Sequence, residues 1–368
     1  MTVPQHQQLL PLEELFQKRT IGRPAELPNL SKNYFTQYQQ MVNVLRTDYY
    51  PNIGTGLAAN SSEPGFYTAH DGQHFDEVVL HAGILAKADV LLVAETTNPG
   101  PTELNAYELY LLLAAIRIHD VGNMYGRDGH EKKCFQILQQ LGAAAGLDTT
   151  EKKIIARIAQ AHGGKTSSGS KDTIEQLHIS TRSGNVVYRP RLLAGIVRIA
   201  DEICENRRRA ANVLLQERKL PHHSEIYHLY AASIVSNSWS VSDRALHLKF
   251  EAKLCDIEKP WGCEARRIDE TTVVKEVYLM DEIFSRLEKM DRERRYCNMY
   301  TREMFTIDAI KVTMDIVSDV DHDLIESVKI PELSDRGYPE DQGTGLRDQL
   351  KTYCGPAYGA ALRQRMEA

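Results

Sequence analysis

The sequence predicts a mainly α-helical protein with a smaller α+β part toward its C-terminal side. Its 368 residues, 42% of them hydrophobic, are enough to bury at least one sizeable core. Apolar residues recur at three- and four-residue steps, which is the spacing of helices, until about residue 222, where alternation with β-branched and aromatic residues favours strands. The five helices expected in the core are residues 73–92, 104–119, 131–146, 150–162 and 190–209.

The chain is expected to have four parts. The first is an N-terminal helical extension, broken at Pro24, Pro28 and Pro51. The helical core follows, then the α+β part, then a tail punctuated by proline and glycine. The predicted boundaries are 1–64, 65–221, 222–330 and 331–368.

Strands are predicted in three places. The alternating stretch 228–254 indicates two or three strands, and residues 305–317 indicate another. A polar crossing loop precedes the last core helix and could hold one short strand at Asn185–Tyr188. Residues 271–300 return to helical spacing.

Composition excludes several classes of protein. A net charge of −6 gives no overall field that would attract a polyanion, so bulk nucleic-acid binding is not expected. Six cysteines without CxxC spacing argue against a zinc ribbon or a disulfide framework. The longest apolar runs, such as Leu109–Ile116, are far shorter than the roughly 18 residues of a membrane span. No secretory signal is recognisable at the N-terminus, so a cytoplasmic location is expected.

The strongest local feature is the dipeptide His119–Asp120. It follows an almost wholly apolar helix and precedes a break at Val121–Gly122. The C-terminal end of a helix carries partial negative charge, which favours a cation, and a buried helix would hold an imidazole and a carboxylate rigidly side by side. A single His–Asp dipeptide is equally compatible with a cap or a solvent-facing position.

Asp201 lies on the apolar face of its predicted helix, in line with Leu193 and Val197. An inward-facing carboxylate is costly unless a cation or hydrogen-bond donors compensate it. A shared metal ion would do so, and an ion pair with Arg198 or Arg208 is the alternative.

Three further histidines have comparable positions. His162 continues an apolar stripe and precedes Gly163–Gly164, while His130 and His74 each begin a predicted helix with apolar residues on the same side. Each alone could be a satisfied core histidine. Together with His119 and the two aspartates, they are more simply explained by a shared cation.

The order His74, His119–Asp120, His130, His162, Asp201 resembles that of the HD-domain metal-dependent phosphohydrolase superfamily, over about residues 65–210. The segments that carry the resemblance are YTAHDGQHFDEVV, LLAAIRIHDVG and RLLAGIVRIADEICENRRRA. The resemblance implies an HD-type helical bundle that binds one or two divalent ions, which could be Mn, Mg, Fe, Co, Ni or Zn.

By the same resemblance, His74, His119, Asp120 and Asp201 hold one ion. His130 and His162 hold a second ion, with Asp120 bridging both, and these three are the expected catalytic residues. Water activated by the metal would attack phosphorus. Phosphate would be neutralised by basic groups, for which the candidates are His70, Arg127, Lys165 and Arg208. The run Arg207–Arg209 could instead be a solvated helix end.

The substrate class follows only from finer similarity. The stretch HDVGNMYGRDGHEKKC is similar to deoxynucleoside triphosphate triphosphohydrolases, although Asn123 and the late Gly129–His130 depart from their pattern. The alternatives are a phosphodiesterase that acts on cyclic or dinucleoside polyphosphate nucleotides, or a nuclease, and a non-catalytic metal-containing sensor domain. A metal-free bundle of paired polar groups is a further possibility. The resemblance also implies a homo-oligomer and an association with bacterial antiviral defence.

Overall fold

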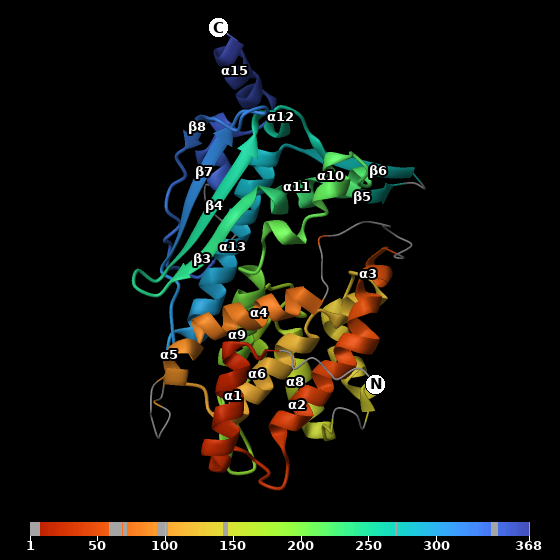
Figure 1. The fold of residues 1–368 in the computed structure, drawn as a ribbon, viewed down its shortest axis with the longest axis vertical. Coiled ribbons are helices and arrows are strands. Elements are labelled where there is room, and N and C mark those ends of the chain that lie inside the picture. Colours follow the sequence, from red (N-terminus) through yellow and green to blue (C-terminus); the bar gives the residue numbers. More distant parts are fainter. Residues whose placement is uncertain are drawn as a thin grey trace.

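The computed structural model places a helical bundle at one end of the molecule and a sheet at the other (Figure 1). It describes residues 8–58, 68, 72–93, 100, 102–142, 146–268, 271–339 and 345–367. The predicted mainly α-helical class is confirmed, whereas the four-part division of the chain stays a prediction. Among the described residues, every helix is too short or too polar to span a bilayer.

The N-terminal helices pack onto the bundle through apolar residues such as Leu12 and Phe16, which are fully buried. They are α1 (Pro11–Gly22), α2 (Tyr34–Val44) and α3 (Tyr50–Ala58). The predicted break at Pro51 is wrong, because the π-helical turn Leu45–Tyr49 carries α2 directly into α3. Proline lacks a backbone N–H and is accommodated in the first turn of α3, where the regular ladder is already interrupted.

The core bundle contains helices in all five predicted segments, with bounds that differ from the prediction. Its helices are α4 (Gly72–Leu85), α5 (Ala88–Val93), α6 (Ala106–Ile118), α7 (Cys134–Gln140), α8 (Thr149–Gln160) and α9 (Pro190–Glu202). The first predicted helix is divided at Lys87, whose φ of 55° cannot continue a right-handed helix. The last predicted helix ends at Glu202, and Arg207–Arg209 form a separate 3₁₀ turn.

The crossing loop between α8 and α9 contains a hairpin of β1 (Thr181–Ser183) and β2 (Val186–Tyr188), which includes the predicted short strand. The predicted strand at 305–317 is found as β7 (Ala309–Val317). The start of the stretch 228–254 is not a strand, because it belongs to helix α11 (Glu225–Ser233). The residues that follow form β3 (Ile234–Ser240) and β4 (Ala245–Lys253).

The larger sheet has the order β3-β4-β7-β8, where β8 is Leu324–Val328. Only the central pair β4 and β7 is parallel. β5 (Trp261–Ile268) and β6 (Thr271–Val277) form a separate hairpin. The first part of the predicted helix at 271–300 is therefore wrong, because it forms β6. The remaining helices are α10 (Asn212–Gln216), α12 (Leu254–Ile257), α13 (Leu279–Thr301), α14 (Leu346–Gln349) and α15 (Pro356–Glu367).

The long helix α13 joins the two ends of the molecule, since it runs past the sheet and continues against α9 of the bundle (Figure 1). The two helices approach closely at Gly195, where an added Cβ would lie 3.0 Å from Thr301 Cγ2. An ion pair between Arg198 of α9 and Glu293 of α13 fixes the same contact. The face of α9 that carries Gly195 and Arg198 is therefore covered by α13, a helix from the C-terminal half.

A buried cation connects the N-terminal helices to the bundle. The guanidinium of Arg117, on α6, is 1% exposed and binds Glu13 at 2.8 Å, Asp76 at 2.5 Å and the Tyr38 hydroxyl at 3.0 Å. Burial opposes its charge, but the neighbouring phenols and carboxylates outweigh this effect and raise the pKa of Arg117. This cluster ties α1, α2 and α4 to the helix that leads into His119–Asp120.

Replacing Arg117 with methionine is expected to lower the free energy of unfolding by about 3–5 kcal/mol, because Glu13 would remain buried without its cation. Arg46→Met is the control, since Arg46 pairs with the same Asp76 but its side chain is 26% exposed. Urea unfolding should give a cost below about 1 kcal/mol for the control. Equal midpoints for the two variants would contradict the role of Arg117.

Candidate metal centre

The centre is built at the C-terminal end of α6. All residues from Ala106 to Ile118 are buried, and the helix ends directly at His119 and Asp120. The chain then turns through the 3₁₀ helix Val121–Tyr125. Gly122 makes this turn possible, because an added Cβ would lie only 2.1 Å from the backbone oxygen of His130. The close approach brings the segment that starts at His130 against the end of α6.

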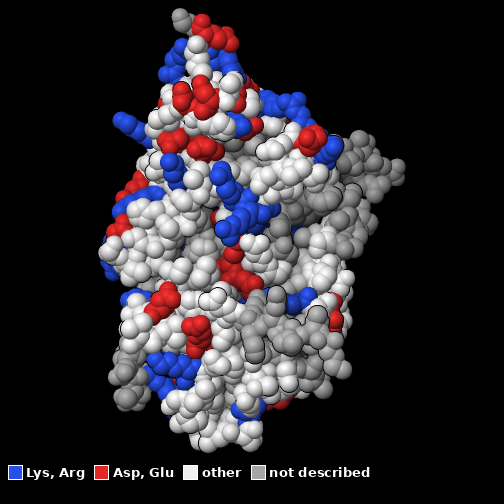
Figure 2. Space-filling model, in the orientation of Figure 1, with Lys and Arg blue, Asp and Glu red and all other residues white. Residues whose placement is uncertain are grey.

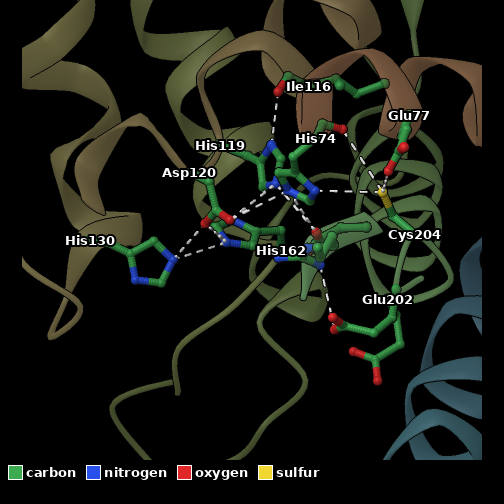
Figure 3. Close-up of polar contacts among 12 residues, drawn as sticks. His74, Glu77, Ile116, His119, Asp120, His130, His162, Glu202 and Cys204 are labelled. Atoms are coloured by element: carbon green, nitrogen blue, oxygen red, sulfur yellow. Dashed lines mark hydrogen bonds and ion pairs between the residues drawn. The ribbon is translucent and has the colours of Figure 1, made fainter. Parts of the chain in front are cut away.

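Four other elements deliver the remaining residues. His74 lies in the first turn of α4, and Asp201 lies near the end of α9. His130 begins the 3₁₀ helix His130–Lys133, and His162 follows the end of α8. Figure 3 shows the imidazoles of His74, His119, His130 and His162 gathered around the carboxylate of Asp120. The structure therefore brings together all six residues predicted as metal ligands.

The first group is His74, His119, Asp120 and Asp201. Asp120 Oδ2 lies 3.6 Å from His74 Nε2 and 3.7 Å from His119 Nε2. Asp201 Oδ1 lies 3.4 Å from His74 Nε2 and 3.5 Å from His119 Nε2. Ligands bonded to one ion at about 2.0–2.1 Å in tetrahedral geometry would be separated by about 3.4 Å. These four side chains could hold one divalent ion.

The second group is Asp120, His130 and His162, and it uses the other oxygen of the same carboxylate. Asp120 Oδ1 lies 2.9 Å from His130 Nε2 and 3.4 Å from His162 Nε2. The two Nε2 atoms are 3.3 Å apart. The two oxygens of Asp120 thus face two different pairs of histidines, as a carboxylate bridging two ions would require.

Backbone contacts fix the orientation of three imidazoles. The Nδ1 atoms of His119, His130 and His162 lie 2.7–2.8 Å from the carbonyl oxygens of Ile116, Arg127 and Ala159, each three residues earlier. A carbonyl oxygen only accepts, so Nδ1 carries a proton, and whenever the ring is neutral Nε2 presents its lone pair. These lone pairs face carboxylate oxygens, which are also acceptors, so a proton or a cation must lie between them.

The observation that supports a fit to a metal ion is that imidazole nitrogens and carboxylate oxygens, both electron-pair donors, face one another. His119 Nε2 is buried and has no hydrogen-bond partner among the described residues, although two carboxylates lie within 3.7 Å. A divalent cation would satisfy imidazole and carboxylate together, whereas protons would have to charge several neighbouring rings. The donor set therefore suits a divalent ion.

The charges of the two aspartates are held by their neighbours. Burial alone raises the pKa of Asp120, but the charge of His119 and hydrogen bonds from His130 and His162 outweigh it and keep the pKa well below its usual range. Burial likewise opposes ionisation of Asp201, and His119 and His74 keep its pKa well below the usual range. Both groups are thus carboxylates, ready to bind a cation.

His74 is oriented differently from the other three. Its Nδ1 lies 3.5 Å from the buried thiol of Cys204, which also lies 3.7 Å from Glu77 Oε2 (Figure 3). The amide of Asn206 donates to the same Glu77 oxygen at 2.7 Å. Residues just after α9 thereby position a ligand on α4, which is a typical role for the neighbours of a metal ligand.

A cavity of about 510 Å³ opens beside Asp120, His130, His162 and Asp201. It lies between the bundle and the C-terminal half. Residues from α11 and α13 line it, among them Tyr227, Tyr230, Arg286 and Lys289. The guanidinium of Arg286 lies 5.6 Å from the ring of Tyr227 and 5.3 Å from that of Tyr230. The sequence motifs gave no reason to expect a contribution from these helices.

The predicted phosphate-binding residues have different outcomes. Arg127 lines the cavity, and its role toward phosphate stays a prediction. Arg208 does not, because its side chain is 76% exposed and lies 4.0 Å from Glu77, and Arg209 lines the cavity instead. Lys165 lines a neighbouring groove. His70 lies outside the described residues.

Two histidines that precede the larger sheet are buried, one wholly and one in part. His228 is only 1% exposed, and its Nδ1 accepts a hydrogen bond from the backbone of Ala211. His223 lines the cavity, and its Nε2 is buried. The suggested ion pair of Asp201 with Arg198 is wrong, since Arg198 pairs with Glu293.

Asp120→Ala is expected to abolish binding of the divalent ion, because both groups of ligands share that carboxylate. His81→Gln is the control, since His81 is a second histidine of α4 and belongs to neither group. Elemental analysis should find the ion in the control only. Melting in excess metal should rise for the control, because an ion at about 100 times its Kd adds about 2.7 kcal/mol. Retention of the ion by Asp120→Ala would contradict the assignment.

Metal affinity is expected to fall as the pH falls. Burial opposes protonation of His74 and His130, but nearby groups, Asp120 among them, outweigh it and raise both pKa values above the ordinary 6.5. An ion must displace these protons, so binding is strongest above the raised pKa values and is lost as the pH drops through them. Calorimetric titrations from about pH 6 to about pH 9 would measure this change. Constant affinity over that range would contradict it.

The comparisons with known proteins agree with this geometry. A family model described as HD-CE matches residues 64–271, a stretch that contains all six residues of the centre. No curated protein and no solved structure matches the chain. The matched stretch is more than half of the 368 residues, and the chain therefore belongs to the HD-CE family, an HD-type family.

Proposed function

We propose that this protein is a metal-dependent phosphohydrolase that cleaves a phosphate bond of a nucleotide. The observation that carries the proposal is the position of Asp120, whose two oxygens face two separate pairs of histidines beside an open cavity. Such a site supplies Lewis-acid activation of water and charge neutralisation at phosphorus when divalent ions are bound. The residues that hold the ions would be His74, His119, Asp120, His130, His162 and Asp201.

The protein's own residues orient the reaction. Carbonyl groups of α6, of the turn at Arg127 and of α8 fix the rings of His119, His130 and His162, so these side chains need no reorganisation during catalysis. His74 and His119 are at most 2% exposed, which excludes bulk water from that side of the centre. His130 and His162 line the cavity, so substrate would approach from there.

The charges of the cavity favour binding of the substrate only after metal ions have bound to the protein. Its described lining contains as many acidic as basic side chains, and several of them are paired with each other, such as Lys289 with Glu202 at 2.6 Å. A polyphosphate would meet no net positive field from the protein alone. Lys171 has no ion pair among the described residues and is the cation that we propose for a terminal phosphate. The acidic and basic groups are Asp120, Asp128, Asp201, Glu202, Glu205 and Glu293, and Arg127, Lys171, Arg198, Arg209, Arg286 and Lys289.

We place a deoxynucleoside triphosphate triphosphohydrolase activity first. A cavity of about 510 Å³ suits a single small ligand, and it is bounded on the far side by Tyr227 and Tyr230, which offer ring faces near Arg286. Among the described residues on the face drawn in Figure 2, acidic and basic side chains are interspersed and form no continuous basic track for a nucleic-acid strand. A phosphodiesterase that acts on cyclic or dinucleoside polyphosphate nucleotides is the second candidate, because two divalent metal ions bound at Asp120 would support that reaction equally well.

The deciding experiment is to incubate the protein and Mn²⁺ or Mg²⁺ with dNTPs, NTPs, cyclic dinucleotides and dinucleoside polyphosphates, and to identify the products by mass. Release of intact triphosphate from dNTPs is expected. Activity should fall at least about 10³-fold in Asp120→Ala, because activation of water depends on the ions, and should persist in His81→Gln.

Cleavage of the cyclic or dinucleoside substrates alone would support the second candidate. Absence of turnover by folded protein that retains its metal would overturn the enzymatic proposal and leave a metal-containing sensor domain. Because metal content is measured on the same samples, loss of the ion and loss of activity can be separated.

A further inference from the structure

A second groove of about 580 Å³ lies on the other side of the segment that follows His162. One wall is the face of α8 that carries Lys153, Ile154 and Arg157, and the opposite wall comes from the crossing loop and the β1-β2 hairpin. Gly163 and Gly164 line both this groove and the cavity of the metal centre, so they form the partition between the two.

The charge of this groove differs from that of the metal-centre cavity. Four basic side chains line it, and none of them has an ion pair or a side-chain hydrogen bond within the described part of the chain. The single acidic residue in the lining is Glu131, which is 7% exposed and therefore turned away from solvent. The lining carries an uncompensated positive charge. Its basic residues are Lys132, Lys153, Arg157 and Lys165.

The remaining lining is apolar and aromatic. Ile154 and Leu177 are partly buried against the core, and Tyr188 is 5% exposed. Burial raises the pKa of the Tyr188 phenol, and the charge of Arg157, which lines the same groove, opposes that rise, so the groove combines a basic and an aromatic group. A ligand with an anionic end and a flat apolar end matches this arrangement.

We propose that this groove is a second binding site, distinct from the metal centre, for a polyphosphate-bearing anion. The shared chemistry is a chain of phosphates held by Lys132, Lys153, Arg157 and Lys165. Lysine and arginine without carboxylate partners are the groups that bind phosphate oxygens at least cost, because no existing ion pair has to be broken. Inorganic polyphosphate and a nucleoside polyphosphate both present that chemistry.

The partition couples this site to the metal centre. Lys165 follows His162 by three residues, and Lys132 follows His130 by two, so a ligand that holds both lysines holds the segments of two histidines of the centre. Gly164 has a φ of +77°, and an added Cβ would lie 2.8 Å from Glu131 Oε1. The two segments are therefore packed against each other, and occupancy of the groove and of the metal centre would influence one another reciprocally.

The test is calorimetric titration of metal-free protein, in excess EDTA, with inorganic tripolyphosphate and with a nucleoside triphosphate. The charge-reversed variant Lys153→Glu/Arg157→Glu should bind both at least about tenfold more weakly. Lys152→Glu is the matched control, because Lys152 is on the same helix but does not line the groove, and it should bind as the unmodified protein does. Unchanged melting curves would show that the variants are folded.

Lys171→Glu separates the two sites, because Lys171 lines only the metal-centre cavity. In metal-free protein the described lining of that cavity has no net positive charge to hold phosphate, so the affinity of Lys171→Glu should equal that of the unmodified protein. Loss of binding in Lys171→Glu with full binding in Lys153→Glu/Arg157→Glu would overturn the proposal, as would absence of binding by either anion. Tighter binding of the nucleotide than of tripolyphosphate would assign the apolar wall to the nucleoside, and equal binding would assign the site to phosphates alone. The titration requires no turnover, so it stands or fails independently of the phosphohydrolase proposal.

Discussion

The carboxylate of Asp120 is the point on which the arrangement of the bundle depends. Its two oxygens serve different histidine pairs, one from α4 and α6 and the other from the ends of α8 and of the loop after Gly129. Displacement of the Asp120 carboxylate would therefore disturb both groups of candidate metal ligands. Two features prevent this displacement: the fully buried helix α6 that precedes it and the backbone contact at Gly122 that follows it.

Three of the four histidines are oriented by the same kind of local backbone contact. Each sits at or just beyond a helical turn, and its Nδ1 is bonded to the carbonyl oxygen three residues earlier. For His119 and His162 that carbonyl group lies in the last turn of a helix, where carbonyl groups lack intrahelical partners. For His130 it lies in the turn that precedes the 3₁₀ helix His130–Lys133. Because this contact depends only on local backbone geometry, His119, His130 and His162 need no side chains from other elements to choose their tautomer.

The sequence could predict those features of the site that depend on local backbone geometry, but not those that depend on how distant elements pack. Helix spacing places Asp201 and His162 on apolar faces, and burial of a polar group implies a partner, so the gathering of these side chains could be predicted from local pattern. Their roles as metal ligands come from the family resemblance and stay predictions. The direction of an exposed cation depends on tertiary packing, and for that reason Lys165 and Arg208 were assigned to the wrong surroundings. Predicting the cavity residues of α11 and α13 required knowledge that α13 packs on α9, which no periodicity encodes.

The cavity of the metal centre and the groove on the other side of the segment after His162 differ in charge. In the cavity of the metal centre, the described acidic and basic lining residues are equal in number, so under the proposed function the net attraction for phosphate would come from divalent ions held at Asp120. In the groove beyond Gly163 and Gly164, the protein itself provides the positive charge. Anion binding in the first should depend on metal and in the second should not. A partition of two glycines thus separates an environment suited to chemistry on a phosphate from one suited to holding a phosphate unchanged.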